Sequence, residues 1–327
     1  MSAAEVTLVT GGAGYIGSHV AKALASQGHK VVVFDDLSTG HEYLAHGHIL
    51  ERGSLLDQHR LGEVIERHAP RAVIHLAGSA YVGESNIDPG KYYRNNVGGT
   101  LNLLTAMRDS GVEKLVFSSS CATYGIPSHI PISEDQPQHP INPYGRSKLV
   151  AEMMMRDFSA AHGLRSVALR YFNAAGASAD GDIGEDHDPE THLIPLAINA
   201  ATGRAAALRI FGDDYDTPDG TCIRDYVHVS DLADAHVKAL TWLDDHDGFS
   251  AFNLANERGN SVRDVIAAVE KATSLRVPHS IGKRRPGDPA RLVGDAARAQ
   301  RMLGWKPLHS SLDEIIASAC RWHRRTK

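Results

Sequence analysis

The sequence predicts an α/β protein with a doubly wound parallel sheet and a second, smaller domain toward the C-terminus. Short apolar segments alternate with helical patterns through the first half of the chain, as repeated βαβ units require. Beyond residue 170 this alternation is lost, and longer loops with several prolines follow. The two observations together favour a large sheet domain followed by a less regular one.

Each expected element rests on its local pattern. The expected strands are residues 6–9, 31–35, 49–51, 73–76, 115–118 and 167–170. Helical patterns between them include residues 61–68 and 99–111. Two later segments, 226–229 and 252–254, look like strands that could return to the main sheet. We therefore expect one domain over residues 1–172, with returning segments near 225–254, and a second domain over 173–224 and 255–327.

A glycine-spaced turn follows the first expected strand. Gly11, Gly14 and Gly17 lead directly into a helical pattern. Glycines at this spacing allow a tight turn, a close approach of the backbone to a pyrophosphate, and close packing of helix on strand. The helix N-terminus adds N–H groups and partial positive charge. The pattern predicts a Rossmann-type dinucleotide-binding turn, and the alternative is a strand–helix turn without a ligand.

The second expected strand ends in Asp35 and Asp36, eighteen residues after Gly17. An acidic side chain there can bond the adenosine ribose hydroxyls of NAD and would repel the additional phosphate of NADP. The alternative is a solvated pair that opens a turn, which applies more to Asp36 than to Asp35. The sequence therefore favours NAD as the cofactor.

Composition narrows the class of protein. The chain has 327 residues and a net charge of -5, which argues against a nucleic-acid surface or an anionic membrane as the main partner. Its three cysteines are scattered, so neither a disulfide framework nor a zinc site is indicated. No secretory segment or membrane span is recognisable. We expect a cytoplasmic enzyme.

Metal binding has to be considered because the chain contains 19 histidines. No H-E-x-x-H or comparable pairing occurs. The acidic segment 180–188 resembles a calcium loop only superficially, because Glu185 stands where that loop requires glycine. We expect a polar surface loop there and no metal site.

A candidate catalytic pair begins the helix expected after residue 142. Asn142 can cap this helix and Pro143 suits its first position. Tyr144 and Lys148 are then four residues apart on one face. The strand that ends in Ser118, Ser119 and Ser120 delivers hydroxyl groups to the carboxyl edge of the sheet, where open α/β folds bind ligands. The alternative is a solvent-facing Tyr and Lys beside a serine-rich strand end.

These residue types fit proton transfer coupled to NAD. A tyrosine has a pKa of about 10, so acting as a base near neutral pH requires a decrease of about 3 units. Burial acts in the opposite direction, so cations must prevail: Lys148 and the positive nicotinamide ring of NAD. Ser120 would orient the substrate hydroxyl, and Lys148 would also hold the nicotinamide ribose.

Several further segments extend these motifs. The chain resembles the extended short-chain dehydrogenase/reductase superfamily, and more closely the UDP-glucose 4-epimerases, in residues 10–19, 82–85, 93–97, 118–120, 142–145, 170–176, 219–226 and 284–288. Residues 121–125 and 189–195 are similar to the branch that serves bacterial exopolysaccharide synthesis. The resemblance runs nearly end to end.

The resemblance implies an isomerase that reversibly epimerises C4 of a UDP-hexose, UDP-glucose or UDP-galactose, through a 4-keto intermediate. It implies bound NAD, a UDP-sugar substrate and a homodimer. The implied cofactor-binding residues are Gly11, Gly14, Tyr15, Ile16, Gly17, Asp35, Asp36, Ser54, Leu55, Leu76, Ala77, Gly78, Asn95, Ser118, Tyr144, Lys148 and Tyr171. The implied substrate residues are Ser120, Tyr144, Asn173, His192, Leu193, Phe211, Arg224, Arg285, Asp288 and Leu292. Among these, the two arginines would meet the diphosphate and Asp288 the uridine ribose.

Three positions depart from relatives. Ser54 stands where an Asp is often found near the adenine, Ala80 where some carry Lys near the nicotinamide, and His192 where some carry Asn at the substrate. The alternative substrates are UDP-xylose with UDP-arabinose, and UDP-N-acetylglucosamine. A 4,6-dehydratase is disfavoured because Cys121 and Ala122 replace the Asp-Glu pair of such relatives. A non-catalytic NAD sensor would not need the proton-transfer residues.

Overall fold

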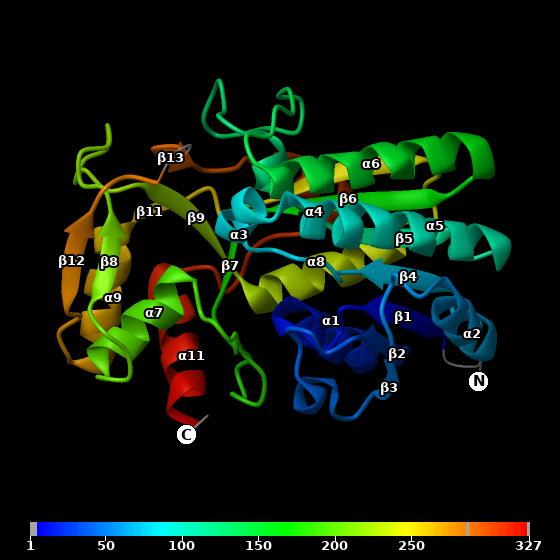
Figure 1. The fold of residues 1–327 in the computed structure, drawn as a ribbon, viewed down its shortest axis with the longest axis horizontal. Helices are drawn as coiled ribbons and strands as arrows, with labels where there is room; N and C mark the ends of the chain where they lie inside the picture. The colour runs from blue at the N-terminus through cyan, green and yellow to red at the C-terminus, as the bar shows by residue number, and fades with distance from the viewer. Residues whose placement is uncertain (1–4, 286–287, 326–327) are drawn as a thin grey trace.

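The computed structural model describes residues 5–285 and 288–325, and its largest feature is a parallel sheet of seven strands (Figure 1). The strand order is β10-β6-β5-β4-β1-β2-β3. The bounds are β1 (Val6–Thr10), β2 (Lys30–Asp35), β3 (Ile49–Arg52), β4 (Ala72–His75), β5 (Lys114–Ser120), β6 (Arg165–Tyr171) and β10 (Phe249–Leu254). The predicted fold class is confirmed. Because the chain moves outward in both directions from β1 and β4, the carboxyl ends of these strands form the crevice where open α/β sheets bind ligands.

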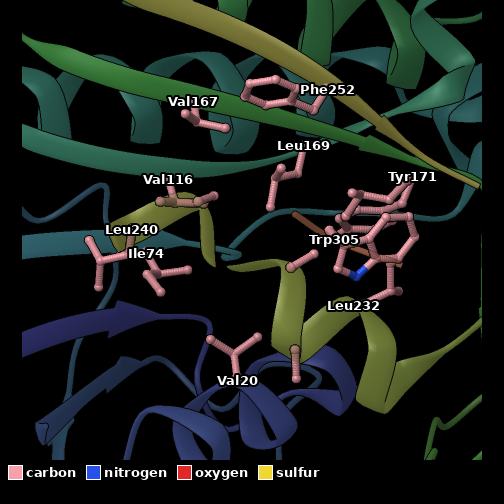
Figure 2. Close-up of a cluster of buried hydrophobic side chains, with 14 of the residues drawn as sticks. Val20, Ile74, Val116, Val167, Leu169, Tyr171, Leu232, Leu240, Phe252 and Trp305 are labelled. Carbon is pink, nitrogen blue, oxygen red and sulfur yellow. The ribbon is translucent and has the colours of Figure 1, made fainter. Parts of the chain in front are cut away.

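Helices cover both faces of this sheet (Figure 1). One face carries α1 (Tyr15–Ser26) and α8 (Val229–Trp242), and the other carries α2 (Gln58–His68), α5 (Gly99–Asp109) and α6 (Pro143–His162). Figure 2 shows the core on the first face, where Val20 of α1 and Leu232 and Leu240 of α8 lie opposite Val116 and Leu169 of the sheet. Burial on both faces explains the nearly continuous apolar strands.

The segment between β4 and α5 is helical in a less regular way. It contains α3 (Val82–Ile87), α4 (Pro89–Tyr92) and a π-helical stretch η2 (Tyr93–Gly98) that continues into α5. A π-helical turn shifts side chains around the helix axis and is frequent at functional sites. Here the turn carries Asn95 and Asn96 toward the carboxyl end of β4, where both side chains bond Ser79.

A second region follows β6. It contains a four-stranded sheet, a two-stranded sheet and a third apolar core. The four-stranded sheet comprises β7 (Asn173–Ala175), β9 (Ile223–His228), β11 (Gly259–Ser261) and β13 (Arg291–Leu292). The two-stranded sheet pairs β8 (Leu208–Phe211) with β12 (His279–Gly282), and the helices are α7 (Leu193–Ala201), α9 (Val262–Thr273) and α11 (Leu312–Arg325). The remaining elements are α10 (Ala297–Leu303) and the 3₁₀ turns η1 (Glu42–Ala45) and η3 (Cys121–Thr123).

One strand expectation is wrong. Of the two segments expected to return to the main sheet, β10 does so beside β6, but residues 226–229 do not. Residues up to His228 belong to β9, which pairs with β7, and Val229 begins α8. The physical reason is that β10 already pairs with the free edge of β6. After Tyr171 the chain leaves the main sheet, and residues 173–175 form β7, which pairs with β9. Among the described residues, none of the helices has the length and apolar character needed to cross a membrane.

Candidate active site

The glycine turn between β1 and α1 is shaped by three different requirements. Gly11 has a φ of +72°, and a Cβ there would lie 2.5 Å from the Ala77 nitrogen. A Cβ at Gly17 would collide with the Gly11 carbonyl oxygen. A Cβ at Gly14 would meet only an ordinary contact, 3.4 Å from the same oxygen, so Gly14 leaves free space above the turn. The N-terminus of α1 has no side-chain cap, and its N–H groups can therefore receive a pyrophosphate.

Asp35 is buried at the end of β2 and fastens that strand to the glycine turn. Its carboxylate accepts bonds from the Ala13 nitrogen at 3.0 Å and the Leu37 nitrogen at 2.9 Å. Burial raises the pKa of Asp35, while these two N–H donors oppose that shift. Asp36 is exposed and accepts a hydrogen bond from the Ser38 nitrogen. This is the arrangement expected of a solvated carboxylate that opens a turn. Each carboxylate oxygen of Asp35 retains a lone pair for a ribose hydroxyl.

The other predicted cofactor residues lie around the same edge of the sheet. Leu76, Ala77 and Gly78 follow β4, and a Cβ at Gly78 would lie 3.6 Å from the Lys148 ammonium nitrogen. Ser54 lies in the turn after β3, and Leu55 is buried against Gly99. Asn95 donates to the Ser79 hydroxyl at 3.1 Å. Ile16 is half-buried in the first turn of α1.

Tyr15, predicted as a cofactor-binding residue, has its side chain engaged by the second region. Its hydroxyl donates to the Gly176 carbonyl oxygen at 2.6 Å, and its ring lies edge-on to His19 and His187. This bond ties the first turn of α1 to the start of the second region. What Tyr15 can offer a nucleotide is therefore its backbone N–H.

Ser120, Tyr144 and Lys148 are brought together where β5 ends and α6 begins. Asn142 caps α6 by accepting a bond from the Gly145 nitrogen at 2.8 Å, as predicted. The Lys148 ammonium donates to the Ser118 carbonyl oxygen at 2.8 Å and lies 5.9 Å from the centre of the Tyr144 ring. Burial raises the pKa of Tyr144 to about 12, and a hydrogen bond with the Ser120 hydroxyl acts in the opposite direction. Burial lowers the pKa of Lys148 to about 8.

The predicted substrate residues form a second group, on β9, β13 and the segments around them. The Arg224 guanidinium donates a hydrogen bond to the Asp288 carboxylate. This ion pair balances the charge of the largely buried arginine. Leu292 is the β-sheet partner of Arg224. The Arg285 guanidinium lies 3.9 Å above the Phe211 ring. Ser120 lies beside Tyr171 in the main sheet. Asn173, two residues later, pairs with Tyr226 of β9, so β7 connects the end of β6 to the strand that carries Arg224.

Asn173 and Leu193 each begin an element of the second region. Asn173 begins β7 beside Tyr226 of β9, and Leu193 begins α7. His192 precedes α7, but its imidazole is held by carboxylates: Glu190 at 3.0 Å and Glu185 at 2.8 Å. Its ring also lies 6.1 Å from that of Tyr81.

The expected polar surface loop over residues 180–188 is only partly exposed, which corrects the sequence interpretation. Ile183, Gly184 and Glu185 are buried, and the Trp322 ring covers Gly184. The Trp322 nitrogen donates to the Glu185 carbonyl oxygen at 2.8 Å. The loop is buried because α11, nearly 140 residues later in the chain, packs over it.

The sequence of this chain is similar to proteins of a known enzyme family. Residues 7–255 match the NAD dependent epimerase/dehydratase family. The chain belongs to this family. It is 51% identical over 320 residues to a UDP-glucose 4-epimerase of Rhizobium meliloti, covering 97% of both chains. The predicted resemblance to UDP-glucose 4-epimerases is thereby confirmed.

Solved structures of family members agree. A UDP-glucose 4-epimerase from Brucella ovis in complex with NAD is 56% identical, with a TM-score of 0.95 over 97% of this chain and 98% of that one. A UDP-glucose 4-epimerase from Bifidobacterium longum in complex with NAD⁺ and UDP is 39% identical, with a TM-score of 0.94 over 98% of each chain.

Two buried polar residues of this family member were missed by sequence reasoning. Glu152 on α6 accepts bonds from the Ser119 hydroxyl at 2.5 Å and from Nε and Nη2 of the Arg170 guanidinium, at 2.9 and 2.6 Å. Asn96 joins the backbone of Ser79 to the Ser147 hydroxyl. Both fix the positions of strands and helices that carry the candidate catalytic residues Ser120, Tyr144 and Lys148. Their partners are distant in sequence, so no local pattern indicates them.

Proposed function

We propose that this chain catalyses the reversible epimerisation of a UDP-hexose at C4, interconverting UDP-glucose and UDP-galactose with NAD bound. The observation that carries the proposal is that Ser120, Tyr144 and Lys148 meet where β5 ends, with two different regions beside them. The segment from Ala77 to Gly78 connects them to the glycine turn, and Tyr171 and β7 connect them to the strand that carries Arg224. This order matches a nicotinamide cofactor on one side and a nucleotide sugar on the other. The epimerases of similar sequence and structure support the same activity.

NAD fits the residues present at the first side. Gly14 leaves space for the pyrophosphate, Asp35 offers a carboxylate to the adenosine ribose, and Lys148 offers an ammonium to the nicotinamide ribose. A bound NAD would supply the hydride acceptor for C4 of the sugar and, in its reduced form, the hydride donor to the other face of the 4-keto sugar. Because the cofactor is regenerated in each cycle, it can stay bound.

Tyr144 is the residue we assign to proton transfer. Its hydroxyl has to be ionised to the phenolate before it can accept the proton of the sugar 4-hydroxyl, and burial opposes this charged form. Lys148 counters this by placing a cation beside the ring, and the Ser120 hydroxyl donates a bond that favours the phenolate. Ser120 also orients the sugar hydroxyl. Returning the proton to the 4-keto oxygen completes the cycle.

The second side holds the nucleotide. Arg224 and Arg285 would meet the diphosphate, because a planar guanidinium makes paired, charge-assisted bonds to phosphate oxygens. Asp288 would accept a bond from a uridine ribose hydroxyl, and it already orients Arg224. Asn173, Leu193, Phe211 and Leu292 would line the remaining surface, with Leu292 nearest the sugar 2-substituent.

We also infer a homodimer in the cytoplasm. Leu101 of α5 and Met153 of α6 are 44% and 53% exposed on neighbouring helices, and exposed apolar side chains of this size favour association. Cys121, Cys222 and Cys320 are all free thiols, which suits a reducing compartment. Light scattering coupled to gel filtration would test the dimer, and cell fractionation would test the compartment.

Product analysis tests the proposed function. The pure protein, without added NAD, is incubated separately with UDP-glucose, UDP-N-acetylglucosamine and UDP-xylose, and the products are identified by NMR. We expect UDP-galactose from UDP-glucose as the fastest reaction, and NAD in the supernatant after denaturation. Faster conversion of UDP-xylose would reassign the substrate. Release of NADP instead of NAD would overturn the role given to Asp35.

A further inference from the structure

We propose that Glu185, His187, Glu190 and His192 form a binding site for one divalent transition-metal ion of the zinc class. All four lie on the loop that connects β7 to α7, within eight consecutive residues. Each offers one ligand atom, and the four atoms lie within 4.8 Å of one another. Two imidazole nitrogens with two carboxylate oxygens are a donor set that Zn²⁺ accepts in proteins.

The separations between these atoms approximate the edges of a coordination tetrahedron. With metal–ligand bonds of about 2.1 Å, the ligand atoms of a tetrahedral zinc site are about 3.4 Å apart. The Glu185 oxygen lies 3.3 Å from Nδ1 of His187 and 2.8 Å from Nδ1 of His192. Of the two Glu190 oxygens, Oε2 lies 3.8 Å from Nδ1 of His187 and Oε1 lies 3.0 Å from Nδ1 of His192. The nitrogen–oxygen distances thus bracket the expected length, and rotation of the Glu190 carboxylate decides which of its oxygens would be the ligand.

The nitrogen of His187 is an independent indication. Its Nδ1 atom is fully buried, yet it makes no hydrogen bond of normal geometry. An unsatisfied buried polar atom costs about 1–3 kcal/mol, so such atoms are usually paired. This one lies within ion-pair distance of two carboxylates but makes no hydrogen bond to either, and a metal ion would bind it directly.

Charge balance is consistent with a divalent ion. Two carboxylates carry two negative charges in a site where Glu185 is buried. Without a metal, both imidazoles must be protonated for neutrality. A divalent ion with two neutral imidazoles gives the same net charge, so replacing two protons by one ion introduces no unpaired buried charge.

The surroundings fix the ligands and suggest a structural role. The Trp322 nitrogen bonds the Glu185 carbonyl oxygen, and the rings of Tyr15 and Tyr81 lie 6.3 and 6.1 Å from the His187 ring. The site therefore joins the loop before α7 to α11 and to the first turn of α1. A bound ion would hold His192, and with it the start of α7, in one position. The alternative is a purely proton-bridged cluster of the same four side chains.

Metal binding can be measured without any assay of activity. Untagged protein is treated with chelator, desalted and titrated with Co²⁺ and then Zn²⁺, with stoichiometry followed by calorimetry and elemental analysis. We expect one equivalent of Co²⁺ with the intense visible absorption of tetrahedral cobalt, and its displacement by Zn²⁺. His187→Gln and Glu190→Gln should each weaken binding by about 100-fold, since even the loss of an outer-shell partner costs 10- to 100-fold.

His309→Gln is the matched control. His309 and Glu314 form an exposed ion pair at 2.7 Å with the same atom types but without two further ligands. This variant should bind Co²⁺ as the parent does. Circular dichroism and gel filtration of each variant establish that binding is compared between folded proteins. If the folded parent binds no equivalent of either ion, or if His187→Gln and His309→Gln bind equally well, the four residues are a proton-bridged cluster and the proposal is wrong.

Discussion

The two sides of the candidate site hold their charged groups in different ways. On the cofactor side, Lys148 is buried with a carbonyl oxygen as its partner, and burial lowers its pKa to about 8. On the nucleotide side, Arg224 already contacts the carboxylate of Asp288. Among the described residues, Lys148 therefore has no anionic partner of its own, and its charge is stabilised most when a neighbouring group becomes negative. The second arrangement has its charge balanced before any ligand binds.

The difference between the unpaired Lys148 and the paired Arg224 indicates that the cofactor side acts mainly on the reaction rate and the nucleotide side mainly on ligand affinity. A buried cation that lacks an anionic partner acts strongly on a nearby group that becomes negative, here the Tyr144 phenolate. A largely buried arginine that is already paired with a carboxylate, such as Arg224 on β9, contributes mainly to the affinity of an anion. We therefore expect substitutions on the cofactor side to lower kcat, and substitutions on the nucleotide side to raise Kd or KM.

Tyr144→Phe gives the largest expected effect. It removes the hydroxyl that accepts the proton and little else, so kcat should fall by about 10³-fold, within the range of general-base contributions. The affinity for UDP, measured by calorimetry, should stay within about twofold of the parent. A variant with near-normal turnover would show that another group accepts the proton. A large loss of UDP affinity would break the separation of the two sides.

Lys148→Met should lower kcat by about 100-fold and also loosen NAD, measured as nucleotide released on gel filtration. It has an additional signature in stability. Because the folded chain holds Lys148 with a lowered pKa, the unfolded chain binds more protons above about pH 8, so the parent gains stability as pH rises from there. Relative to Lys148→Met, nucleotide-free parent should gain at most about 1.4 kcal/mol per pH unit in urea denaturation. Parallel pH profiles would mean that Lys148 is not the titrating group.

The cofactor side was predictable from sequence because its information is local. Gly11, Gly14 and Gly17 lie within one turn, and Tyr144 and Lys148 lie on one helical turn, so spacing alone places them. The cap by Asn142 was predicted for the same reason. The fold class could be predicted because the strands are apolar along their whole length. They are apolar because helices cover both faces of the sheet.

The nucleotide side and the loop before α7 could not be derived from spacing. Arg224 and Asp288 are 64 residues apart and meet only because β9 pairs with β13. For these residues the only guide in the sequence was resemblance to a family. The cluster of Glu185, His187, Glu190 and His192 could not be recognised from spacing, because E-x-H-x-x-E-x-H follows no helical ligand motif and the loop that gathers the four residues packs against Trp322.

Arg285→Ala sharpens the comparison with a matched neighbour. Arg285 stacks on Phe211, whereas Arg284 is already bonded to Asp214 at 2.6 Å and stacks on Tyr215. Arg285→Ala should raise the Kd for UDP about 10- to 100-fold, the loss of about 1.5–3 kcal/mol expected for hydrogen bonds to a charged group, with kcat changed much less. Arg284→Ala should raise it less than about threefold. Equal effects would show that both arginines act only through general positive charge.

Leu292→Tyr has the smallest effect and tests only the shape of the nucleotide side. Leu292 is half-buried beside Arg224, at the position we assign to the sugar 2-substituent. Leucine is intermediate in volume, so the parent should prefer UDP-glucose and UDP-galactose and convert the N-acetylated pair weakly. Overpacking by tyrosine costs about 1–3 kcal/mol, which should reduce the N-acetyl activity at least about tenfold and leave kcat/KM for UDP-glucose within about twofold. Leu292→Ala should shift selectivity in the opposite direction. If the tyrosine variant still converts the N-acetyl sugar at the parental rate, sugar size is read at another position, and the nucleotide side contributes affinity without discriminating between sugars.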